Sequence, residues 1–112
     1  MTYKEISELV ASVGVPYAYY QFPNDTPQQP PFICFLYEDS GDLAADNVNY
    51  QRIRRVSLEL YTQTKDFTLE NTVETVLNNA GLYYSRSEQY LDSERMNMVI
   101  YEFEVVVTEE IL

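Results

Sequence analysis

The chain has 112 residues, close to the commonest size of a single domain, and 46% of them are hydrophobic, which excludes a disordered tail. Eighteen acidic residues against seven basic ones give a net charge of −11. Such a surface repels phosphate backbones, so we expect no tightly held nucleic acid.

Cysteine usage and the absence of apolar runs indicate where the chain folds. Cys34 is the only cysteine, so no internal disulfide can form, and its apolar neighbours predict a small buried side chain. The first ten residues are amphipathic, which is untypical of a signal peptide. No apolar run approaches the roughly 20 residues of a membrane span. We therefore expect no membrane association and folding in a reducing cytoplasm.

A short amphipathic helix is predicted at the start of the chain. Thr2 and Glu5 have the spacing of a capping box, in which each side chain binds the other residue's backbone amide. Gly14 supplies a residue suited to the helix end. The apolar residues between them recur at helical spacing, at Ile6, Leu9, Val10 and Val13. We expect the helix over residues 3–13.

The middle of the chain reads as strands separated by two loops. Residues 17–22 and 32–38 have strand composition, and four prolines in the intervening segment 23–31 exclude helix and sheet interior there. Residues 39–47 have the composition of a second loop. Apolar and polar residues then alternate in the second half of a long strand expected over 48–64.

A second helix and two strands complete the predicted order. Asp66 can cap the helix, whose apolar stripe is Leu69, Val73, Val76 and Leu77. Residues 82–90 and 97–108 read as strands. The order α-β-β-β-α-β-β predicts one α+β domain spanning residues 1–112, with a single antiparallel or mixed sheet and both helices packed on one face.

The residues that usually carry catalysis are missing. The chain has no histidine, the commonest general base and transition-metal ligand, and three glycines leave no phosphate-binding loop. Composition alone leaves room for a carboxylate-pair hydrolase, but nothing places two acids together in an apolar pocket. We expect no enzyme, no cofactor, no catalytic residue and no metal centre.

An acidic loop is the one place where a cation remains an open alternative. Asp39, Asp42 and Asp46 follow Glu38, and oxygen-rich loops can bind calcium. Their spacing differs from that of a helix-loop-helix calcium site. A solvated acidic loop is the favoured interpretation.

The remaining candidates point to contacts between proteins. Arg52, Arg54 and Arg55 could bind an anion, pair with carboxylates within or between subunits, or guard an exposed strand end; pairing with carboxylates is favoured. The loops 23–31 and 39–47 are candidate contact arms. The full set of subunit-interface candidates is Arg52, Arg54, Arg55, Phe22, Tyr37, Asp39, Asp42 and Asp46.

Several segments resemble one family. Residues 15–23 (VPYAYYQFP) and 30–37 (PPFICFLY) look like the start of a small protein of tailed phages. Leu58–Thr62, Ser93–Met96 and Tyr101–Val105 continue the likeness. The chain thus resembles the phage tail-terminator or tail-completion (head–tail joining) family of Gram-positive siphophages and prophages. The matching positions are scattered structural ones without a catalytic signature.

The resemblance implies a structural role in a virion. Members of the family form a ring, usually of six subunits, that caps the tail tube and joins it to the head connector. It implies a tail tube protein and a head connector protein as partners, DNA that passes without tight binding, and a place at the head-proximal end of the tail after synthesis in the host cytoplasm. The alternative is a small acidic protein-binding module, such as a regulator or inhibitor, acting as a monomer or dimer.

Overall fold

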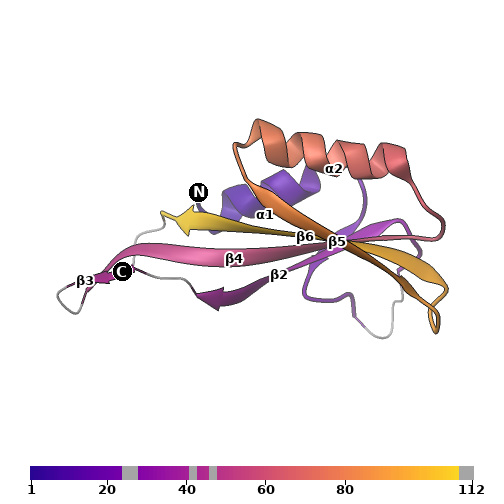
Figure 1. Ribbon diagram of the computed structural model, residues 1–112, viewed down its shortest axis with the longest axis horizontal. Coiled ribbons are helices and arrows are strands. Elements are labelled where there is room, and N and C mark those ends of the chain that lie inside the picture. The colour runs from indigo at the N-terminus through magenta and orange to yellow at the C-terminus, as the bar shows by residue number, and fades with distance from the viewer. Residues whose placement is uncertain (24–27, 41–42, 46–47, 109–112) are drawn as a thin grey trace.

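The computed structural model describes residues 1–23, 28–40, 43–45 and 48–108. Figure 1 shows both helices on one side of the sheet. The expected fold class, element order and packing of the helices are confirmed, with one short strand added. The elements are α1 (Tyr3–Ala11), β1 (Tyr17–Tyr19), β2 (Phe32–Ser40), β3 (Leu43–Ala45), β4 (Val48–Thr62), α2 (Phe67–Asn79), β5 (Tyr84–Leu91) and β6 (Met96–Val107).

The sheet is mixed and is built around its two longest strands. Its order is β1-β2-β4-β6-β5, and β3 pairs with the part of β4 that extends beyond this path. The short strand β1 runs parallel to β2, and the other pairs are antiparallel. The β4–β6 ladder runs without a break from Arg52 opposite Val107 to Thr62 opposite Asn97. Because this register is continuous, side chains two residues apart on β4 lie on the same face.

Both helices begin at the residues that the sequence indicates. The Thr2 hydroxyl accepts from the Glu5 amide at 3.0 Å, and the Glu5 carboxylate accepts from the Thr2 amide at 2.8 Å. Asp66 caps α2 by accepting from the Leu69 amide at 2.9 Å. These contacts satisfy amides that have no partner within the helix.

The core lies between the two helices and one face of the sheet. Five of the eight apolar helix residues expected to be buried are buried, and the other three, Leu9, Leu69 and Val76, are half-buried against the core. The sheet contributes alternate residues of its three central strands: Ile33, Phe35, Val56, Leu58, Leu60, Val99, Tyr101, Phe103, Val105 and Val107.

Two expected segments differ from the structure. The strand expected over 17–22 ends at Tyr19, because Tyr20 adopts a left-handed backbone with φ of 71°. The loop expected over 39–47 is wrong in part, because β2 continues to Ser40 and β3 pairs with β4. Pairing with β4 therefore outweighs the polar, turn-like composition of this segment. Residues 24–27, 41–42 and 46–47 of the two expected arms lie outside the described residues.

Candidate functional site

One face of the sheet is turned away from both helices (Figure 1). We call it the open face. Strand alternation places on it the side chains that lie between the core residues. Among the described residues these are Phe32, Cys34 and Leu36 of β2; Ile53, Arg55, Ser57, Glu59 and Tyr61 of β4; Met96, Met98, Ile100, Glu102, Glu104 and Val106 of β6; and Ser85, Ser87, Gln89 and Leu91 of β5.

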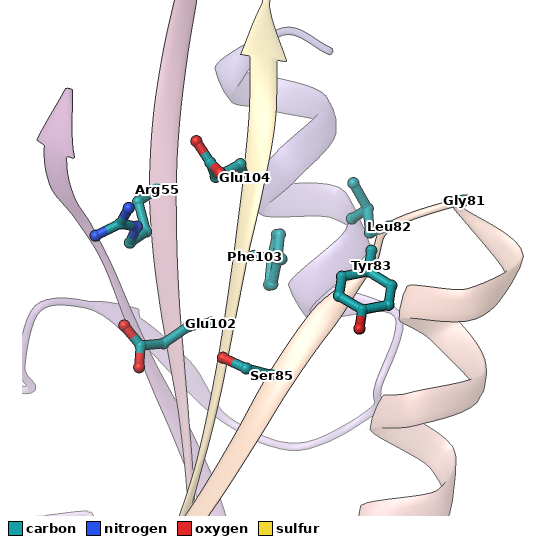
Figure 2. A pocket seen from close by; sticks show the side chains of 8 residues that line it. All are labelled: Arg55, Gly81, Leu82, Tyr83, Ser85, Glu102, Phe103 and Glu104. Carbon is teal, nitrogen blue, oxygen red and sulfur yellow. The ribbon is translucent and has the colours of Figure 1, made fainter. Parts of the chain in front are cut away.

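One end of the open face is hollowed around a single arginine (Figure 2). The depression has a volume of about 590 Å³ and is lined by Arg55, Ser85, Glu102 and Glu104, with Tyr83 at the start of β5. Arg55 is the cross-strand neighbour of Glu104, yet its guanidinium points away from that carboxylate. Arg55 forms no ion pair with any residue in the described part of the chain. The hollow therefore holds two carboxylates and one unpaired cation.

The three clustered arginines do not share one surface. Arg52 and Arg54 are opposite Val107 and Val105, whose side chains point into the core, so both arginines lie on the helix side of the sheet. Arg55 lies on the open face. Both helix-side arginines are half-buried, and Arg54 donates to the Ile53 carbonyl oxygen at 3.3 Å. The sequence cluster is thus divided between two faces.

The opposite end of the open face is aromatic. The rings of Phe32 and Tyr61 stack with centroids 4.7 Å apart, and Phe22 meets Phe32 edge-on at 5.5 Å. These residues line a depression of about 500 Å³, together with Cys34 and Glu94. Residues 20–23 and Gln28 thus lie over this end of the face.

Burial and the Glu59 carboxylate both raise the pKa values of the two ionisable groups at this end, Tyr61 and Cys34. Burial raises the pKa of Tyr61, and the Glu59 carboxylate, which accepts from the tyrosine hydroxyl at 2.8 Å, raises it further. Burial, with a smaller contribution from Glu59, also raises the pKa of the Cys34 thiol to about 11. Both groups are neutral near pH 7, so Cys34 lacks the thiolate that a nucleophile needs.

The other interface candidates fall in different places. Phe22 lies at the aromatic end of the open face, whereas Tyr37 lies on the helix side, with its ring 5.2 Å from that of Tyr3 and 5.4 Å from that of Tyr19. Asp42 and Asp46 lie outside the described residues, and of Asp39 only its place in β2 is described. The structure therefore brings Tyr37 towards Arg54 and separates both from Phe22.

A charged cluster beneath α2 was missed by the sequence interpretation. Glu70 is buried and binds Arg86 at 2.5 Å and Lys65 at 2.8 Å. Lys65 also pairs with Glu88, and hydrogen bonds from Lys65 and Asn97 lower the pKa of Glu88. The signal was present, since Glu70 occupies the same helical stripe as Val73 and Leu77 and so had to be buried.

No group of three or more acidic or cysteine side chains in the described part of the chain is placed to hold a metal ion. No described helix is long and apolar enough to cross a membrane. What the open face offers is a broad surface for binding.

Comparison with known proteins gives a likeness of fold. No family model and no curated protein matches the chain. Eight chains of solved structures match, among them a chain in the structure "Virion of native gene transfer agent (GTA) particle". It aligns with a TM-score of 0.63 and 16% sequence identity, covering 88% of this chain and 83% of that one. At this identity the comparison shows a shared fold.

Proposed function

We propose that this chain is a virion structural protein: a tail-terminator or tail-completion subunit, six of which form a ring that caps a phage tail tube and joins it to the head connector. It acts at the head-proximal end of the tail and is not an enzyme. The observation that carries the proposal is the fold likeness, over 88% of this chain, to a chain in a virion structure.

Other features support the same role. The segments that resemble the tail-terminator family include β1, most of β2, the end of β4 and the middle of β6. A net charge of −11 suits a ring through which DNA passes without binding tightly. The bare open face and the arginines at one end of β4 provide surface for subunit contacts.

The test is deletion of the gene from the phage or prophage that encodes it, followed by electron microscopy of the lysate. We expect unjoined heads and tails of irregular or excessive length, and we expect the wild-type gene supplied in trans to restore complete particles. Complete particles in the deletion strain would refute the proposal.

The competing function is that of a small acidic protein-binding module. The open face supports this second function, because an exposed apolar surface that also carries carboxylates can bind other proteins. Purified tails separate the two functions. A tail-terminator should co-sediment with tail tubes and be found at one end by immunogold labelling, whereas a regulator or inhibitor should remain in the supernatant.

A further inference from the structure

The two faces of the sheet carry opposite charge at the sites where a neighbour could bind. Resting on the ring proposed above, we propose that Arg52 and Arg54 of one copy, with Tyr37 and Tyr19 beside them, dock onto the open face of the next copy. We call these four residues the arginine–tyrosine patch. The occupant of the open face is thus a second copy of this chain.

The four residues of the arginine–tyrosine patch lie on the helix side of the sheet. Tyr37 pairs in register with Val56, and Arg54 and Arg52 follow on the same face of β4. The Tyr37 ring lies 5.4 Å from the ring of Tyr19, which is half exposed at the β1 edge. Arginine and tyrosine are the residue types most enriched at the energetic centres of protein interfaces.

The open face complements this patch in charge and in polarity. Among the described residues it presents Glu102, Glu104 and Glu59, the last hydrogen-bonded to Tyr61, against the single cation Arg55. Apolar side chains flank these carboxylates, with Leu36 on β2 and Ile100 on β6. A partner that combines guanidinium groups with aromatic rings matches such a surface, because the rings cover the apolar positions and the guanidinium groups pair with the carboxylates.

The positions of the two surfaces favour a head-to-tail contact, as in the proposed ring, over a two-fold dimer. An isologous dimer needs one patch that complements itself, whereas a heterologous contact joins two different patches and repeats around an axis. The arginine–tyrosine patch and the open face lie on opposite sides of one sheet. Two copies stacked open face to open face would bring their excess carboxylates together.

The open face offers a contact smaller than a standard protein–protein interface. With neighbouring strands about 4.8 Å apart and about 3.3 Å per residue, four strands over eight residues cover roughly 500 Å². A standard interface buries about 800 Å² on each partner. Each subunit of the proposed ring would make two contacts of this smaller size, one through each of its two surfaces.

Adjacent arginines provide a matched comparison. Variants R52E/R54E and R55E are supplied in trans to the deletion strain, and the plaque titre is measured. We expect R52E/R54E to lower the titre at least about tenfold, because weak ion pairs are reversed at every contact of the ring. R55E should not lower the titre, because it makes the acidic open face that receives the arginines more acidic still. Circular dichroism of the purified variants verifies that each one folds.

Mixing complementary variants gives a second, independent readout. E102K/E104K reverses the open face and should also lower the titre, while E8K, on an exposed position of α1, should not. R52E/R54E and E102K/E104K expressed together should restore the titre, because each variant then meets a neighbour of opposite charge. Such a ring alternates the two variants, which an even number of subunits permits.

The outcomes separate this inference from the proposed function. If the deletion strain needs the wild-type gene but R52E/R54E and R55E have equal effects, the docking inference is wrong and the function stands. If folded R52E/R54E and E102K/E104K each fail and the mixture also fails, the pairing of these two surfaces is likewise refuted. If the deletion strain forms complete particles, the proposed function itself fails.

Discussion

Glu70 links helix α2 to strand β5 through its ion pairs. Its carboxylate is buried beneath α2 and meets Arg86 of β5 and Lys65, both about one-third exposed. The hydrogen bond from Arg86 to Glu70 raises the pKa of the guanidinium. Two cations replace the water that this buried carboxylate has lost. The pairs therefore tie α2 to the edge strand β5.

Glu70→Gln should lower the free energy of unfolding by about 1–3 kcal/mol, because the amide leaves two cations without their shared counter-charge. Urea denaturation followed by circular dichroism measures the loss. Glu8→Gln, on an exposed position of α1, is the matched control and should change stability by less than about 0.5 kcal/mol. Equal losses in the two variants would contradict the role given to Glu70.

The Cys34 thiol provides a second test at the residue scale. Its pKa of about 11 lies two pH units above the ordinary value of 9.0, so at pH 8 the native thiolate fraction is about a hundredfold lower than in the unfolded chain. Alkylation by iodoacetamide should be slower in the native protein by at least that factor. The same shift makes the native state lose stability as pH rises above about 9, because only the unfolded chain then releases the proton. Equal alkylation rates with and without urea would disprove this account.

At the scale of elements, the helices were the most predictable part of the chain. Thr2, Glu5 and Asp66 are local signals, and each makes the contact that its position indicates. Strands β1 and β3 were harder, because each has three residues and is held by its neighbour rather than by its own composition. Strand β1 ends where Tyr20 adopts a left-handed backbone, and the residues around Tyr20 give no sequence signal that predicts this conformation.

Asp66→Ala should destabilise the protein by about 1 kcal/mol, since the Leu69 amide loses the carboxylate that accepts its hydrogen bond. Asp66→Asn keeps an acceptor at this position and should recover most of the loss. Thermal unfolding of the two variants measures the difference. If both variants unfold at the same temperature, the stabilisation by Asp66 does not come from this hydrogen bond.

The candidate interface was predictable in its residue types but not in its geometry. Arg52, Arg54 and Arg55 are clustered in sequence, and period-two alternation separates Arg55 from the other two. Which of them belongs to the helix side depends on the register of β4 against β6 and on where the helices pack. Tyr37 joins Arg54 only through the pairing of β2 with β4. Pairing between strands that are distant in sequence cannot be predicted from the residues of either strand alone.

For the whole molecule, the net charge of −11 sets how stability responds to salt. Raising NaCl from about 0.01 M to about 0.15 M shortens the Debye length from about 30 Å to about 8 Å and so weakens repulsion between surface carboxylates. The pairs at Glu70 are buried and screened less. We expect the melting temperature to rise over this range, by a similar amount in KCl. A constant or falling melting temperature would contradict a dominant role for surface repulsion.

The parallel pairing of β1 with β2 has a consequence for the dynamics of the sheet edge. Parallel neighbours need a connection that returns to the starting end, and here residues 20–31 make that return. Pairing over only three residues contributes little stabilisation, and it must offset the entropy lost in closing so long a connection. We expect β1 amide protons to exchange with solvent faster than those of β4 by local detachment without global unfolding. Each detachment uncovers the outer edge of β2, which then becomes a template for a strand from another chain.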